Sequence, residues 1–236
     1  MESKYRIEGF GQPLERTASS EAVNTFMWRV YRWMTLGLGV TGLIAMLVAS
    51  SPDAVAFLFG NRWLFYGILI AELGIVFAFS AVAARASFAA AAAMFFVYAA
   101  LNGVTFASIF LVYTHASIAQ VFFVTAGTFG VLSVLGATTK RDLTAMGQFM
   151  LVGLIGVVIG SVVNIFWANP ALYWVTTYAG VLIFAGLTAY ETQRLRRLFM
   201  TQGGDTGNLA LRGALIFYLD FVNLFLMLLR IFGNRR

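Results

Sequence analysis

The sequence predicts an all-α membrane protein with seven transmembrane helices. Of its 236 residues, 60% are hydrophobic and only 11% are charged, whereas soluble domains carry about 25% charged residues. The mean hydropathy is +0.83, and the apolar residues fall into long runs separated by short polar segments. At about 20 residues per crossing, the chain has room for roughly six to eight crossings and for no separate soluble domain.

Residues 1–24 are polar and mixed in charge, and we predict a cytoplasmic tail there, followed by a transmembrane domain at 25–236. The first apolar run begins too late, and lacks the small-residue cleavage site, for a secretory signal. Trp28, Tyr31 and Trp33 precede that run in an expected interfacial helix, where aromatic residues act as anchors.

Seven apolar runs follow, and each is long enough for one crossing. Ser51-Pro52-Asp53 breaks the helix after the first run, and Asn169-Pro170 makes a tight turn before the sixth run. The predicted crossings are 34–50, 63–83, 87–113, 118–138, 146–167, 171–195 and 213–232.

The distribution of basic residues predicts the orientation. Counted by alternate sides of the membrane, 12 Lys and Arg residues fall on the side of the N-terminus and 4 on the other. The positive-inside rule therefore places the N-terminus in the cytoplasm and, with seven crossings, the C-terminus outside. Three of those four residues, Arg230, Arg235 and Arg236, lie at the extreme C-terminus, so a re-entrant last segment remains an alternative.

Five charged residues lie within or beside the apolar runs. At 1.5 Å per residue, Glu191 and Asp220 fall at similar depths on the cytoplasmic side, where Arg85 can reach them. Glu72 and Arg230 fall in the outer half. We therefore expect an inner group, Arg85, Glu191 and Asp220, and an outer pair, Glu72 and Arg230.

Two carboxylates in a low-dielectric site share a proton, accept an arginine or hold a cation, because they cannot easily both ionise. Intramembrane acids are accordingly functional candidates. The alternative is that these acids form static ion pairs that only hold the helices together. Small residues can, however, hold membrane helices together without charges.

Three segments resemble the Bax inhibitor-1 (transmembrane BAX-inhibitor-motif) family, and the bacterial inner-membrane branch fits best. They are Tyr218-Leu-Asp-Phe-Val-Asn-Leu-Phe-Leu-Met-Leu-Leu-Arg-Ile-Phe-Gly, Leu187-Thr-Ala-Tyr-Glu-Thr-Gln and Thr138-Thr-Lys-Arg-Asp-Leu. The resemblance implies seven helices with the last one central, and a pH-sensitive calcium leak channel.

The resemblance also implies residue roles. Glu191 and Asp220 correspond to the pH-sensing and cation-binding pair, and Arg85 to the arginine that latches the acid of the sixth helix. Glu72 and Arg230 correspond to a second latch. The chain departs from the family pattern at Glu191, where Asp is usual, and the longer side chain changes the spacing of the pair.

Other function classes fit the sequence poorly. The chain has one histidine, His115, and no cysteine, so we expect no enzyme and no cofactor. The resemblance implies calcium as the transported ion, with Glu191 and Asp220 as its ligands. The net charge of +6 comes from residues beside apolar runs rather than from a nucleic-acid-binding patch. The second hypothesis that stays open is a membrane-embedded regulator that binds a partner such as an inner-membrane protease through the tail.

Overall fold

Eight α-helices make up almost all of the chain that the computed structural model describes, residues 19–82, 85–202 and 206–236. Their bounds are α1 Ser20–Ala49, α2 Pro52–Gly60, α3 Arg62–Val82, α4 Phe88–Val112, α5 His115–Thr138, α6 Thr144–Trp167, α7 Pro170–Gln202 and α8 Thr206–Phe232. All except α2 are long and apolar enough to cross a membrane. The prediction of an all-α, seven-span membrane protein is therefore confirmed.

Local sequence signals explain where several helices begin. Ser19, Ser51, Ser87 and Thr114 each cap a helix by accepting a hydrogen bond from a backbone N–H in its first turn. The turn between α6 and α7 depends on Ala168, which adopts the left-handed conformation with φ 46°. Asn169 Oδ1 then accepts the N–H of Ala171 at 2.8 Å, which starts α7.

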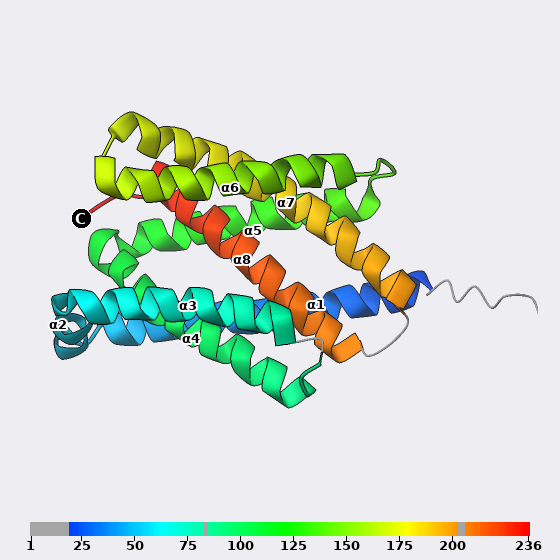
Figure 1. Ribbon diagram of the computed structural model, residues 1–236, viewed down its shortest axis with the longest axis horizontal. Coiled ribbons are helices and arrows are strands. Elements are labelled where there is room, and N and C mark those ends of the chain that lie inside the picture. The colour runs from blue at the N-terminus through cyan, green and yellow to red at the C-terminus, as the bar shows by residue number, and fades with distance from the viewer. Residues whose placement is uncertain (1–18, 83–84, 203–205) are drawn as a thin grey trace, which may run out of the picture.

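The last crossing helix is the centre of the bundle. α8 runs obliquely between α1 and α4 on one side and α5 and α7 on the other (Figure 1). Within its most apolar stretch 61% of the residues are buried, against 6% in α3 and in α6. The outer helices therefore face lipid, and α8 forms the core.

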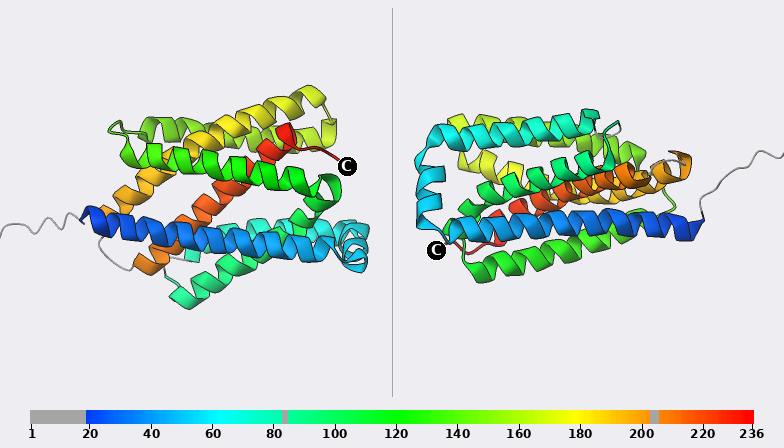
Figure 2. Two further views of the ribbon diagram at one scale, coloured as in Figure 1. Left: turned by 180° about the vertical axis from the view of Figure 1, so that it is seen from behind. Right: turned by 90° about the horizontal axis from the view of Figure 1, so that it is seen from below.

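The structure gives the bounds of the predicted segments. α1 is one continuous helix, Ser20–Ala49, which contains both the segment expected as an interfacial helix and the end of the tail predicted at 1–24; residues 1–18 of that tail lie outside the described part. The Ser-Pro-Asp segment starts the short helix α2, because Ser51 caps it and Pro52 suits its first turn. α2 lies crosswise at one end of the bundle (Figure 2).

Two helices extend beyond the spans that their apolar residues predicted. α7 continues to Gln202 through a segment with three arginines, because arginine favours helix about as much as leucine does. α8 begins at Thr206, ahead of the predicted crossing at 213–232.

The C-terminus lies at the opposite end of the bundle from the start of α1 (Figures 1 and 2). There Asn234 O accepts the N–H of Thr114 at 3.1 Å, and Arg236 N–H donates to Val112 O at 2.9 Å. Since α8 is continuous and its end is attached to the α4–α5 connection, the re-entrant alternative for the last segment is wrong.

A close helix contact generates a stability prediction. A Cβ added at Gly136 of α5 would collide with the backbone carbonyl of Ala189 on α7, whereas a Cβ at Gly127 of α5 meets nothing within 4 Å. Because backbone cannot yield as a side chain can, Gly136→Ala should lower the free energy of unfolding by about 1–3 kcal/mol. Gly127→Ala should leave it unchanged or raise it slightly. Thermal unfolding in detergent micelles measures both, and equal stability of the two variants would contradict this packing.

Candidate functional site

Asp220 is a buried acid at the centre of the bundle. Its position on α8 leaves the residue 7% exposed, and its Oδ2 atom has no hydrogen-bond partner among the described residues. Unpaired buried charge is costly in a membrane. Asp220 is therefore a candidate functional group in the core of the bundle.

Glu191 on α7 is a second buried acid, and it faces the same helix contact as Asp220. The residue is 5% exposed, and its carboxyl interacts electrostatically with that of Asp220. The packing of α7 on α8 thus places the two acids that the sequence singled out near enough for their charges to interact.

Arg194 pairs with Glu191 from the next turn of α7. Its Nη1 lies 3.0 Å from Oε1 and 3.3 Å from Oε2 of Glu191. The arginine side chain is 48% exposed, so it links the buried acid to the end of the bundle. This role of Arg194 was not predicted, although its spacing of three residues from Glu191 on one helix was a usable signal.

The structure does not bring Arg85 to Glu191 as expected. Arg85 is exposed in the α3–α4 connection, and the described part of the chain contains no ion pair between the two. The neighbouring Ala86 O accepts a hydrogen bond from Asn208 Nδ2 at 2.8 Å. Asp220 lies roughly 18 Å further along α8 than Asn208 at the rise of an α-helix, which exceeds the reach of an arginine side chain.

The expected outer pair does not form either. Thr105 of α4 donates a hydrogen bond to Glu72 Oε1 at 3.1 Å, and Glu72 interacts electrostatically with Tyr218 of α8. The guanidinium of Arg230 instead lies 5.3 Å from the ring centroid of Tyr173 on α7. Arg230 is roughly 18 Å beyond Tyr218 along α8, so Glu72 and Arg230 differ in depth as well as in the helix they face.

A polar cluster that the sequence analysis missed surrounds Tyr218. The Tyr218 hydroxyl and Thr41 Oγ1 of α1 are 2.7 Å apart, and Thr41 Oγ1 is 2.8 Å from Ala99 O of α4. Tyr98 of α4 stacks edge-on against Tyr218, with the ring centroids 5.7 Å apart. Tyr218 and Asp220 point in directions roughly 200° apart around the helix, so α8 has one polar face toward α1 and α4 and another toward α7.

The site offers few ligands for a tightly bound metal ion. No group of three or more His, Cys, Asp or Glu side chains gathers within the ranges that the structure describes. Calcium takes about 6–8 oxygen ligands in proteins. Glu191 and Asp220 would thus contribute only part of such a coordination shell.

The α5–α6 connection is attached to the end of α7. Gln193 Oε1 accepts the N–H of Leu143 at 3.0 Å, and Gln193 Nε2 donates to Arg141 O at 2.9 Å. Asp142 and Arg197 form an exposed ion pair of 3.0 Å. Hydrogen bonds from the side chain and backbone of Thr144, with the contribution of Arg197, lower the pKa of Asp142 to about 2. Asp142 therefore stays ionised at neutral and mildly acidic pH.

The architecture and the site together define a class, a polytopic α-helical membrane protein with a carboxyl pair buried at its central helix. A sequence model described as "Inhibitor of apoptosis-promoting Bax1" matches residues 23–236. The chain belongs to the Bax inhibitor-1 family, and the resemblance noted from its motifs is confirmed.

Relatives cover nearly the whole chain. The inner membrane protein YbhL of Escherichia coli strain K12 is 48% identical over 218 residues, which are 91% of this chain and 93% of that protein. An uncharacterized protein of Deinococcus radiodurans is 43% identical over 218 residues, 92% of this chain and 93% of its own. An uncharacterized membrane protein of Streptococcus pyogenes serotype M3 is 36% identical over 221 residues, 92% and 96% of the two chains. The seven apolar helices and the relative from E. coli support a multi-pass inner membrane protein.

The contrast between Arg194 and Arg85 is directly measurable. Removing the guanidinium of Arg194 leaves Glu191 buried without its partner, so Arg194→Gln should lower the free energy of unfolding by about 1–2 kcal/mol. This is less than for a fully buried pair, because Arg194 is half exposed. Arg85→Gln should change it by less than about 0.5 kcal/mol, as exposed substitutions do. Thermal unfolding of both variants at neutral pH tests this, and a larger loss in Arg85→Gln would reinstate the partner expected from the sequence.

Proposed function

We propose that the protein is a pH-sensitive calcium leak channel, gated at the carboxyl pair Glu191 and Asp220. The observation that carries the proposal is the burial of both acids at the α7–α8 contact, with Asp220 Oδ2 lacking a partner within the described chain. A protein that only binds partners at its surface gains nothing from such acids. Membership of the Bax inhibitor-1 family supports the same reading.

In this proposal the pair holds one proton or one cation at a time. Arg194 pairs with the ionised form of Glu191, whereas burial disfavours that form. The mutual repulsion of the two carboxyl groups means that they cannot easily both ionise. Arg194 and Glu191 lie on the same helix, so their ion pair does not itself join α7 to α8. Protonation of Glu191 releases the Arg194 side chain and changes the charge at the α7–α8 contact, where Asp220 lies. α7 and α8 can then separate, so acid favours opening.

Protonation also removes a calcium ligand, so the proposal allows a flux optimum at intermediate pH. The tightly packed side chains around Asp220, including Phe217 and Leu224 at 0% exposure, mean that conduction needs movement of α8. No catalytic step, cofactor or nucleic acid enters the proposal; calcium ions, protons and the lipid bilayer are the partners. A protease-binding regulator would depend on residues 1–24 instead.

Asp220→Asn tests the gate. The amide keeps the shape of the side chain but cannot ionise, so calcium flux should fall at least about tenfold and lose its dependence on pH. Asp142→Asn is the matched control, because Asp142 is ionised throughout the range tested and should leave the pH profile unchanged. Flux into dye-loaded proteoliposomes between pH 5 and 8, after size-exclusion chromatography confirms folding, gives the answer. Wild-type flux and pH dependence in Asp220→Asn would mean that the acids are only structural.

We also propose a cytoplasmic N-terminus, from the 12 to 4 distribution of basic residues. Since the chain has no cysteine, single substitutions Ser20→Cys and Asn234→Cys report one position each. A membrane-impermeant maleimide added to intact spheroplasts should label Asn234→Cys, and Ser20→Cys only after lysis. The reverse labelling pattern would show that the protein has the opposite orientation in the membrane.

A further inference from the structure

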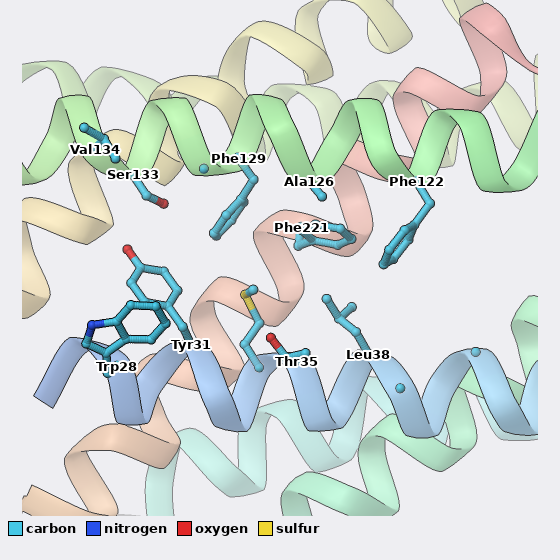
Figure 3. A pocket seen from close by; sticks show the side chains of 14 residues that line it. Trp28, Tyr31, Thr35, Leu38, Phe122, Ala126, Phe129, Ser133, Val134 and Phe221 are labelled. Atoms are coloured by element: carbon cyan, nitrogen blue, oxygen red, sulfur yellow. The ribbon is translucent and has the colours of Figure 1, made fainter. Parts of the chain in front are cut away.

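A cleft lies between α1 and α5, outside the candidate site. Its volume is about 740 Å³, and α1 and α5 form its walls while Phe221 of α8 lies at its base (Figure 3). The lining belongs to helices that are apolar enough to span a membrane, and Trp28 and Val134 at its edge are 69% and 60% exposed. The cleft therefore opens sideways, toward lipid.

The chemistry of the lining differs between the two ends. Leu38, Gly42, Phe122 and Ala126 make one end apolar, and a narrower cavity of about 90 Å³ continues from it along α1. An apolar space of this kind excludes water, because water needs polar partners. The apolar end of the cleft is therefore suited to bind a hydrocarbon chain.

The other end carries an unsatisfied polar group. Ser133 of α5 is 4% exposed, and its Oγ has no hydrogen-bond partner within the described part of the chain. The hydroxyl of Tyr31 points from α1 across the cleft toward Ser133 (Figure 3). Two hydroxyl groups at the end of an apolar cleft indicate a ligand with one polar end.

The dimensions agree with a lipid chain. From Trp28 to Gly42 the cleft follows α1 for roughly 21 Å at the rise of a helix, and one leaflet contributes roughly 15 Å of hydrocarbon. A helix of a second copy, about 10–12 Å wide, is too thick to reach a hydroxyl as buried as that of Ser133. Arg32 directly follows Tyr31 on α1, and Lys140 lies just beyond the end of α5 that carries Ser133; both side chains are exposed.

We propose that this cleft is a binding site for one membrane phospholipid. One acyl chain lies along α1 and α5 above Phe221, and an ester carbonyl accepts a hydrogen bond from Tyr31 and, once the Ser133 side chain rotates toward the cleft, from Ser133. Arg32 and Lys140 contact the phosphate. The site is separate from the carboxyl pair, so it stands whether or not the protein conducts calcium.

Glycines in the wall provide a clean test. Added side chains at Gly42 and Gly130 would enter the cleft, and a Cβ at either meets nothing within 4 Å, so the protein itself tolerates them. Gly127 of α5 is equally open but does not line the cleft. Gly42→Phe with Gly130→Phe fills the cleft, and Gly127→Phe is the matched control.

The experiment reconstitutes each protein in vesicles of phosphatidylethanolamine and phosphatidylglycerol, extracts it in mild detergent and counts bound phospholipid by native mass spectrometry. The wild type and Gly127→Phe should retain one phospholipid per chain, and the filled variant should lose about 90% of it, a tenfold change in occupancy ratio or more. Ser133→Ala, which changes little volume, should weaken retention roughly fivefold, the effect of one hydrogen bond.

Three results would overturn the proposal. One is a wild type that carries no phospholipid, and another is equal retention in the filled and control variants. The third is a lipid-free dimer that the filled variant cannot form, because it would identify a second copy of the chain as the occupant. Should the filled variant fail to fold, Ser133→Ala with unchanged retention still contradicts the site.

Discussion

The burial of Asp220 in the central helix is the constraint on which the rest of this structure depends. An acid at this depth needs polar or charged neighbours, or it must itself be protonated. The position of α8 at the centre therefore depends on which side chains surround Asp220. On the α7 side Asp220 faces a second acid, Glu191, whose charge is paired with Arg194 rather than with Asp220. On the opposite side of α8, Thr41 and the Tyr98 ring accommodate Tyr218. The two polar contacts hold a mostly apolar helix at one rotation and one depth.

The helices around α8 divide into two kinds. α1, α4, α5 and α7 contact α8 directly, whereas α3 and α6 expose most of their surface and lie at the periphery. Close approach in the inner shell relies on small residues, as at Gly136 against the backbone of Ala189. Where α1 and α5 both pack on α8, a cleft remains between them. Movement of α8 would thus change both the carboxyl pair and the cleft, because Phe221, which lines the cleft, follows Asp220 directly in the chain.

The sequence by itself determined the class of the protein and its most informative residues. Apolar runs of about 20 residues identify crossings whatever their neighbours are, because hydrocarbon requires each helix to satisfy its own backbone hydrogen bonds. A carboxylate inside such a run is conspicuous for the same reason, which is why Glu72, Glu191 and Asp220 could be singled out. Motif similarity identified the family, and the central place of the last helix followed from it.

Only the tertiary structure decided which side chains meet. Depth along a helix can be estimated from the sequence, but the rotation of each helix and its tilt against its neighbours cannot, because helices that are apolar all round carry little directional signal. Arg85 and Arg230 were therefore assigned to acids that they do not reach, while Arg194 pairs with Glu191 and Thr105 bonds to Glu72. The cleft beside Ser133 likewise exists only because two helices distant in sequence pack on a third without filling the space between them. Such contacts depend on helix packing, whereas the crossings themselves depend on composition alone.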